Sequence, residues 1–494
     1  MIRELNHLWA ALSIAWLSFA CVSIQAQSES DVMLYSSHDI YGSARFSAMG
    51  SSFGALGGDI STMSTNPAGL GLFRSGEFTL TPALITSNTN SSYYGNEIEE
   101  SDIDFAFTNL GYAQVYELDH DKWKYAQFGF AFNRLKDFHA DRTLNGRQDE
   151  SSLLDLIAGE ALGVDTNDII SYDPFYIAPA YFTFLIDPYV DSDGFFYEDV
   201  IPDGTRLDQD ISISQRGRMS ETVFGGAANY DDRLYIGFSM AFQRAIRDEL
   251  MLFRETVVDT GMTELDFYEF DQDLEVRGDG VNIKLGAIYR ATDNIRIGGS
   301  YTSPTWFSFS NTWSTSWYSR FDNGDTYAES SFAIGLNQYR FRSPSRLTAS
   351  LGLIIAKQAA LNIEYEYLDF SGAKFSRAAG TDLDFSVENN EIARQYVPVG
   401  NLRIGGEWRY KTISLRGGFA YYPSPFEEGL TISSADRYQY STGLGYRKDR
   451  FNLDLAYRIS RSVSDYYPYD PDIIAAAEIE DEVHALMLTL GFRF

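Results

Sequence analysis

The chain has 494 residues, a formal net charge of −30 at pH 7, 33 Tyr, 35 Phe and one Cys. This negative balance argues against nucleic acid as a partner and against docking on an anionic membrane through a basic patch, because both need clustered Lys and Arg. The 40 Gly and 15% aromatic residues are typical of many strands joined by tight turns.

Residues 1–26 have the pattern of a secretory signal peptide. Arg3 precedes an apolar run over 8–24, and the small residue Ala26 follows it. Cys21 lies inside this run; a lipoprotein site there is an alternative that the preceding residues fit poorly. With cleavage after Ala26 the mature chain holds no cysteine and no disulfide. After this segment the sequence has no run of about 18 apolar residues, which a transmembrane helix would need. The sequence therefore indicates an exported protein that is not a helical membrane protein.

Residues 27–75 are rich in small side chains and predict a compact unit ahead of the strands. Ser43 is expected to cap a helix over 44–56, and Asp59 a second short helix. We expect this unit to be a helical hatch that plugs the lumen of a barrel. An ordinary N-terminal cap lying against the sheet is the alternative.

From residue 76 to 494 apolar and polar side chains alternate with the period of two that is typical of β-strands. In the last segment, Leu486, Leu488 and Leu490 share one face with two phenylalanines. About fourteen such segments occur, and each has the roughly ten residues that a tilted strand needs to cross a bilayer. They lie near 76–87, 103–118, 123–136, 219–229, 233–249, 276–290, 294–304, 345–356, 359–370, 399–410, 412–422, 436–447, 450–461 and 483–494.

The connections alternate between short polar turns and long loops, of which 137–218 is the longest. Short turns on one side and long loops on the other are typical of an outer-membrane barrel. A soluble β-sandwich or a propeller is the alternative, but neither sorts its loops by length in this way.

The polar faces of the predicted strands carry many ionisable residues, which could not share one dry core unpaired. They predict a polar lumen, with the apolar face against lipid; a soluble sheet with one solvated face is the alternative. The fold class predicted is therefore all-β, a transmembrane antiparallel barrel over 76–494. The lumen-facing candidates are Arg403, Glu407, Arg416, Asp454 and Arg458.

The loop over 137–218 holds seventeen Asp and Glu against five Lys and Arg, with an aromatic and aliphatic run among them. This run predicts either an outer groove for an apolar ligand or a small core of the loop's own. Because the acidic loops do not attract carboxylates, a neutral hydrophobic ligand fits at least as well as a fatty acid. The groove candidates are Phe175, Tyr176, Tyr181, Phe182, Phe184 and Leu185.

Catalytic and metal-binding patterns are missing. The five His lie near no recognisable nucleophile motif, no GxSxG occurs, and no pair of His has metal-ligand spacing. We therefore expect no enzyme activity, no metal and no cofactor. An outer-membrane lipid hydrolase stays a remote alternative, and weak calcium binding by the Asp-rich loops is another.

The box Asn66, Pro67, Ala68 and Gly69, with the small-residue helix before it and the strands after it, resembles the long-chain fatty acid transporter (FadL/TodX) family of outer-membrane proteins, in the form common in Bacteroidetes. That resemblance implies a fourteen-stranded barrel plugged by a hatch, with the box as hinge or anchor of the gate. It implies uptake of fatty acids or neutral hydrocarbons by hatch movement and a lateral opening beside a kink of the third strand. Gly129 and Asn133 are the candidates for the kink, although either is also an ordinary strand residue.

The resemblance also implies the surroundings of the protein: the outer membrane of a Gram-negative bacterium, its lipid and lipopolysaccharide, and a monomeric state. Phe494, an aromatic residue ending an alternating strand, looks like the signal read by the barrel-assembly machinery. Some Bacteroidetes members of the family serve type IX secretion by binding protein cargo or partners, which is the alternative function.

Overall fold

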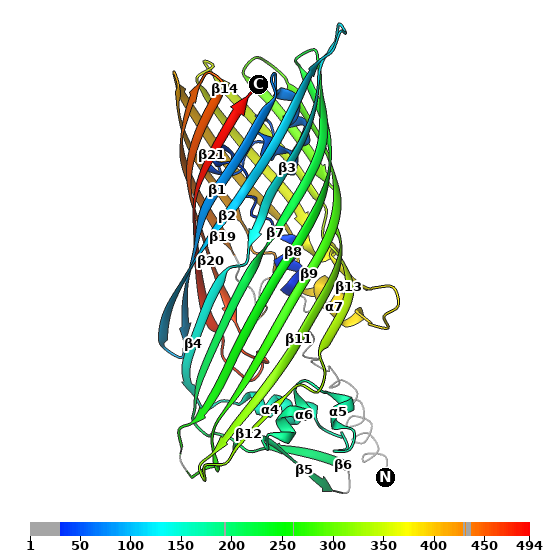
Figure 1. Ribbon diagram of the computed structural model, residues 1–494, viewed down its shortest axis with the longest axis vertical. Helices are drawn as coiled ribbons and strands as arrows, with labels where there is room; N and C mark the ends of the chain where they lie inside the picture. Colours follow the sequence, from blue (N-terminus) through cyan, green and yellow to red (C-terminus); the bar gives the residue numbers. More distant parts are fainter. Residues whose placement is uncertain (1–29, 192–193, 260, 428–429, 431–435) are drawn as a thin grey trace, which may run out of the picture.

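The computed structural model describes residues 30–494 except 192–193, 260, 428–429 and 431–435, and in it the chain forms an antiparallel sheet that closes into a barrel (Figure 1). The first strand closes the barrel by pairing with both the second and the last, for example Phe78 with Tyr112 and with Phe492. Fourteen strands make the wall, which confirms the predicted all-β barrel. Among the described residues, no helix has the length and apolar character needed to cross a membrane.

Several of the fourteen wall strands consist of two segments separated by a short break. In chain order they are β1 (Glu77–Tyr93), β2 (Asn96–Glu117), β3 with β4 (Trp123–Asp137 and Ala140–Gln148), β7 (Leu207–Tyr230), β8 (Leu234–Val257), β9 (Leu265–Arg290), β10 with β11 (Ile295–Thr302 and Trp306–Phe321), β13 with β14 (Gly335–Arg342 and Arg346–Ile355), β15 with β16 (Ala359–Asp369 and Lys374–Arg377), β17 (Pro398–Tyr410), β18 (Ile413–Tyr422), β19 (Arg437–Lys448), β20 (Phe451–Tyr466) and β21 (Ala477–Arg493).

Several strands run much further toward the long loops than their apolar alternation indicates. On β8 the outward side chains are apolar from Ile236 to Phe242 and become charged at Arg244, yet the strand continues to Val257. The wall therefore extends beyond its apolar belt at the long-loop end. As a result β4 and the first half of β7 occupy both ends of 137–218, and the connection between them covers 149–206.

A small folded unit covers the long-loop end of the barrel (Figure 1). It contains α4 (Leu153–Glu160), α5 (Ile169–Tyr172), α6 (Ile177–Phe182) and the hairpin of β5 (Ile186–Asp191) with β6 (Gly194–Asp199). Ser152 caps α4, whose buried face packs into an apolar core shared with β11. β12 (Thr326–Ser330) pairs with β11 at this end, and η3 (Phe370–Gly372) and α7 (Ser386–Gln395) lie in the connections on either side of β16.

The chain ahead of β1 lies inside the barrel (Figure 1). We call residues 30–41, with α2 (Ser30–Ser36), the strap, and residues 42–73 the hatch; the hatch contains α3 (Ala44–Ala48), η1 (Ile60–Ser64) and η2 (Pro67–Leu72). Nearly all hatch side chains are buried. The predicted signal peptide, residues 1–26, lies outside the described residues.

The expected helix caps of the hatch are present, but its first helix is shorter than predicted. The Ser43 hydroxyl accepts from the Phe46 N–H at 3.1 Å, and the Asp59 carboxylate accepts from the Ser61 N–H at 3.0 Å. The helix expected over 44–56 ends at Ala48. Gly50 then has a φ of +60°, which places its backbone directly against Phe419 of β18. Docking onto the wall therefore overrides the local helix preference.

Candidate functional site

The Asn66-Pro67 box ties the hatch to the wall. The Asn66 side chain is buried and caps η2, accepting from the Ala68 N–H at 3.1 Å. Its amide nitrogen donates to the carbonyl of Gly54 at 2.7 Å and to that of Ala287, on β9, at 3.3 Å. One side chain thus links η2, the preceding hatch segment and a wall strand, so the box is built as an anchor.

The wall has glycines at the points where its backbone approaches the backbone of the hatch closely. A Cβ on Gly237 would lie 2.3 Å from the carbonyl carbon of Pro67, and one on Gly286 would lie 2.0 Å from Asn66 Oδ1. The same holds at Gly298, Gly405 and Gly418, where a Cβ would lie 2.1 to 2.3 Å from hatch backbone atoms. These contacts were not predicted from the sequence, in which the Gly-Gly pairs 298–299, 405–406 and 417–418 are the visible signal for three of the five positions.

Gly129, a candidate for the wall kink, belongs to the same class of close contacts. It pairs regularly with Ala113 on β2 and Gly225 on β7, and a Cβ there would lie 2.8 Å from Met63 Sδ of the hatch. The strand is regular at Gly129, so this glycine makes room for the hatch and does not mark the bend.

Asn133, the other kink candidate, lies where the irregular part of the wall begins. It is the last residue of β3 in the β2 ladder, paired with Asn109, and its side chain donates to Ser64 Oγ of the hatch at 2.7 Å. The register toward β7 shifts between Arg134 and Lys136, and the strand is interrupted after Asp137. The bend therefore follows Asn133 by a few residues.

Beyond this bend the wall has a gap in its hydrogen-bonded ladder. Residues 96–108 of β2 pair with β1, but on their other side no described strand pairs with them, and β4 pairs with β7. Side chains bridge the two edges instead: Thr143 Oγ1 donates to Glu100 Oε1 at 2.9 Å, and the Asn96 amide donates to the carbonyl of Asn145 at 3.0 Å. We call this region, between 96–108 and 134–148, the wall gap.

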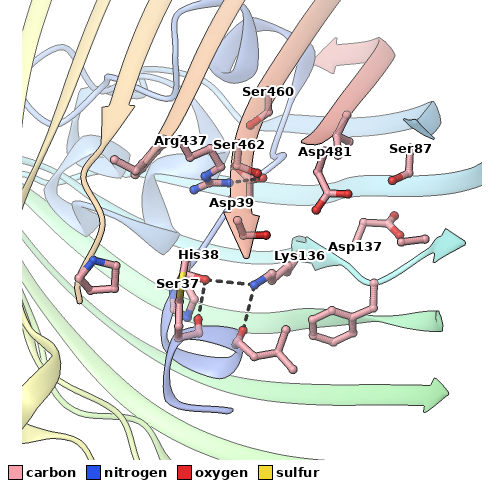
Figure 2. Close-up of a pocket in the computed structure, with 18 of the residues that line it drawn as sticks. Ser37, His38, Asp39, Ser87, Lys136, Asp137, Arg437, Ser460, Ser462 and Asp481 are labelled. Carbon is pink, nitrogen blue, oxygen red and sulfur yellow. Dashed lines mark hydrogen bonds and ion pairs between the residues drawn. The ribbon is translucent and has the colours of Figure 1, made fainter. Parts of the chain in front are cut away.

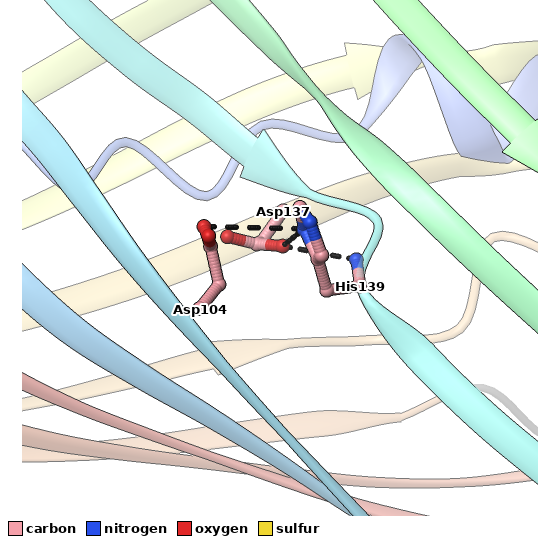
Figure 3. A group of neighbouring side chains, drawn as sticks. All are labelled: Asp104, Asp137 and His139. Carbon is pink, nitrogen blue, oxygen red and sulfur yellow. Dashed lines mark hydrogen bonds and ion pairs between the residues drawn. The ribbon is translucent and has the colours of Figure 1, made fainter.

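A charged cluster spans the end of the wall gap nearest the bend (Figure 3). Asp104 of β2 faces Asp137 and His139, and the His139 and Asp137 side chains hydrogen-bond at 2.8 Å. These three residues have the donor types of a metal site. Arg134, however, contacts carboxylate oxygens of both Asp104 and Asp137 at 2.8 Å. Its guanidinium pairs with both carboxylates and offsets one of their two negative charges, so the arrangement fits an ion-pair cluster that holds the edges of the gap together.

A cavity of about 450 Å³ lies in the lumen directly behind the bend, between the strap and the wall (Figure 2). Phe138 and His139, which connect β3 to β4, and Ala140, the first residue of β4, are part of its lining. Much of the lining is apolar and includes Leu34, Ile85, Phe138, Leu368, Phe370 and Val399. The cavity therefore reaches the bend and offers an apolar surface beside it.

The cavity also contains the buried side-chain amine of a lysine. Lys136 donates to the Leu34 carbonyl at 3.2 Å and to Ser37 Oγ at 3.1 Å, both neutral oxygens of the strap (Figure 2). The other Lys and Arg side chains of the lining pair with carboxylates, as Arg142 does with Asp481 at 3.0 Å. Of these cations, within the described part of the chain, Lys136 alone lacks an ion-pair partner.

The ionisable residues predicted for the lumen lie inside the barrel and hold one another and the plug. Arg403 pairs with Glu364 at 2.8 Å. Arg416 pairs at 2.6 Å with both Glu407 and Asp454. Glu407 also pairs with Arg45 of the hatch at 3.0 Å, and the Arg458 guanidinium lies 3.8 Å from the ring centre of Tyr41. These contacts tie the hatch and the strap to β17 and β20.

The six aromatic and aliphatic candidates of the long loop are not brought together in one groove. Tyr176 and Leu185 are buried in the core of the unit at the long-loop end, and Phe175 packs on Trp313. Phe182 is exposed and contacts Tyr181 and Phe332, and Phe184 is exposed against Tyr327. The run thus mainly forms the loop's own core.

Lowering the pH is expected to stabilise this unit. Burial, with a smaller contribution from Asp173, raises the pKa of Glu160 at the end of α4 to about 7. An unfolded Glu has a pKa of about 4.3, so between these values the folded unit binds more protons and its stability falls as pH rises. Protection factors of amides in 149–206, in which exchange rates are corrected for the intrinsic pH dependence of amide exchange, should fall from pH 5 to pH 7 in the wild type. In Glu160→Gln this pH dependence should be weaker; an unchanged dependence would contradict the assignment.

Comparison with known proteins identifies a family and solved structures that share this fold. The family model described as "Outer membrane protein transport protein (OMPP1/FadL/TodX)" matches residues 228–494, more than half of the chain. A FadL homologue of Pseudomonas aeruginosa shares the fold with a TM-score of 0.56 at 12% identity, over 92% of this chain and 99% of that one. The toluene transporter TodX of Pseudomonas putida matches with a TM-score of 0.52 at 13% identity, over 92% and 99%.

The toluene transporter TbuX of Ralstonia pickettii matches with a TM-score of 0.50 at 17% identity, over 92% of this chain and 98% of that one. No curated protein matches the sequence. In an outer-membrane barrel the short turns face the periplasm and the long loops face the outside. The chain belongs to the FadL/TodX family of outer-membrane transport proteins and is an outer-membrane β-barrel with a transport role for hydrophobic compounds.

Proposed function

We propose that the protein takes up long-chain carboxylates, such as fatty acids, through the lumen cavity and releases them sideways through the wall gap. The observation that carries this proposal is the cavity itself: a partly apolar chamber at the bend of the wall that contains one buried lysine without a carboxylate partner. An apolar chain fits the lining, and a carboxylate fits Lys136, because a charge-assisted hydrogen bond is stronger than one between neutral groups.

The hatch stays seated in this proposal. Asn66, the glycine contacts and the Arg45–Glu407 ion pair all hold it against the wall, and moving it would break them together. The two edges of the wall gap, in contrast, are joined by side chains with no backbone ladder. Because separating side-chain contacts costs less than removing a packed plug, the lateral route is favoured over hatch movement.

The acidic outer loops do not decide the class of ligand. Their negative charge favours a neutral hydrocarbon over an anionic ligand, and two of the structural relatives are toluene transporters by name. The selective contact lies deeper, however, where the ligand is desolvated. There a carboxylate gains from Lys136, and a neutral hydrocarbon leaves this lysine without an anionic partner.

Replacing Lys136 by Gln is expected to weaken binding of a long-chain carboxylate about tenfold, which corresponds to about 1.4 kcal/mol. Binding of an uncharged hydrocarbon of equal chain length should stay within about twofold of the wild type. The measurement is ligand binding to purified barrel together with uptake into cells, and Lys122→Gln, in an exposed turn at the far end, is the control. Equal loss for both ligands, or no loss for the carboxylate, would overturn the proposal. Selective uptake of the hydrocarbon would establish a neutral substrate instead.

A further inference from the structure

Three cations lie together on the outward face of the wall, on neighbouring strands. Arg340 and Arg342 are on β13 and Lys374 is on β16, and all three side chains are exposed. Arg342 lies directly opposite Lys374 in the antiparallel register, and Arg340 lies opposite Ser376. We call Arg340, Arg342 and Lys374 the basic patch.

The register places the basic patch at the outer edge of the membrane. Trp306 of β11, exposed on the same face, lies opposite Arg342 and also opposite Val281 of β9. On the periplasmic side of this row the outward side chains are apolar or aromatic and exposed; they include Tyr301, Leu347 and Tyr367. Trp and Tyr mark the interface of a membrane barrel, so the cations next to them on the long-loop side lie at the level of the outer-leaflet head groups.

Among the described residues, the basic patch lacks internal counterions, unlike three other exposed arginines of the wall. Arg244 pairs with Asp279 at 3.9 Å, Arg277 with Asp248 at 2.5 Å and Arg320 with Asp266 at 3.4 Å. Among the described residues, no carboxylate forms an ion pair with any of the three patch cations, and Arg342 donates only to the Gly372 carbonyl at 3.2 Å. In a chain with a net charge of −30, three adjacent unpaired cations indicate an anion supplied from outside the protein.

We infer that the basic patch binds the phosphate groups of lipopolysaccharide in the outer leaflet. This glycolipid is the phosphate-bearing component at that level of a Gram-negative outer membrane, and its acyl chains would lie along the apolar face that contains Leu347 and Tyr367. Guanidinium groups bind phosphate oxygens through two parallel hydrogen bonds, and a lysine adds a compact charge beside them. The bond from Arg342 to Gly372 holds one of the two guanidinium groups in place for this contact.

The test is binding of purified full-length barrel to rough lipopolysaccharide, compared with the same lipid after its phosphates are removed. The variant Arg340→Gln, Arg342→Gln, Lys374→Gln is expected to bind the phosphorylated lipid at least tenfold more weakly than the wild type. It should bind the dephosphorylated lipid as the wild type does. Heat-modifiable migration in gels shows whether each barrel is folded, and Arg342→Gln alone replaces the triple variant if that variant does not fold.

The control removes the same amount of charge from turns at the periplasmic end, with Lys122→Gln, Lys357→Gln and Lys448→Gln. This variant should retain wild-type affinity for lipopolysaccharide. An equal loss of affinity in the control would show that only the net charge of the protein matters. Unchanged binding by the patch variant would show that these residues do not hold the lipid. Either result overturns the inference.

Discussion

Replacing Gly298, Gly405 and Gly418 together with alanine is expected to unseat the hatch and leave an open pore. At each position the added Cβ would lie 2.1 to 2.3 Å from backbone atoms of Gly54, Met49 or Gly50. Backbone cannot rotate away as a side chain can, so either the hatch or the wall must shift. Overpacking of this kind costs about 1–3 kcal/mol at each site, and three sites act on one plug.

The strands contain a matched control for this prediction. Gly299, Gly406 and Gly417 adjoin the three inward glycines, and a Cβ on any of them would meet its nearest neighbour only at 3.8 to 3.9 Å. Planar-bilayer conductance and entry of a large hydrophilic antibiotic should rise strongly in the inward triple variant and stay at wild-type levels in the outward one. Equal behaviour of the two variants would show that glycine content, and not hatch packing, governs the pore.

The number and direction of the strands were predictable from sequence because half of each strand contacts lipid. That contact enforces alternation, as in the apolar outward series of β8 that ends at Phe242. Where the wall leaves the apolar belt, at Arg244, both faces become polar and the signal disappears although the strand continues. Alternation alone therefore predicts strand ends too close to the membrane and long loops that are longer than those of the structure.

The site was harder to predict, because it depends on contacts between distant segments and on the missing backbone pairing along one side of β2. Nothing local in β2 shows that residues 96–108 lack a partner on one side, since they alternate like any paired strand. Lys136 looks like an ordinary strand lysine until the strap, a hundred residues earlier, is placed against it. The Asn66 box was recognisable because its capping chemistry is local: the Asn66 side chain accepts from the Ala68 N–H. Its part in a gate stays a prediction.

Linking the two edges of the wall gap is expected to stop transport without touching the hatch. Glu100 of β2 and Thr143 of β4 are joined only by a side-chain hydrogen bond of 2.9 Å, so cysteines at these positions lie within reach of a short thiol linker. Cys21, the one cysteine of the chain, lies in the predicted signal peptide, so we expect no native cysteine to react with the linker. If ligand leaves through the gap, the linked Glu100→Cys, Thr143→Cys variant should take up labelled fatty acid at least tenfold more slowly, and cleaving the linker should restore uptake.

The same two wall strands provide the control, because elsewhere they are already joined by a backbone ladder. Tyr116 on β2 lies opposite Ala126 on β3, and linking cysteines at these positions adds a bond where the wall cannot open. Uptake should then be unchanged. Binding to the lumen cavity should persist in both linked proteins, since Lys136 and the strap are untouched. Undiminished uptake with the gap linked would exclude the lateral route and return the hatch, despite its packing, to the centre of the mechanism.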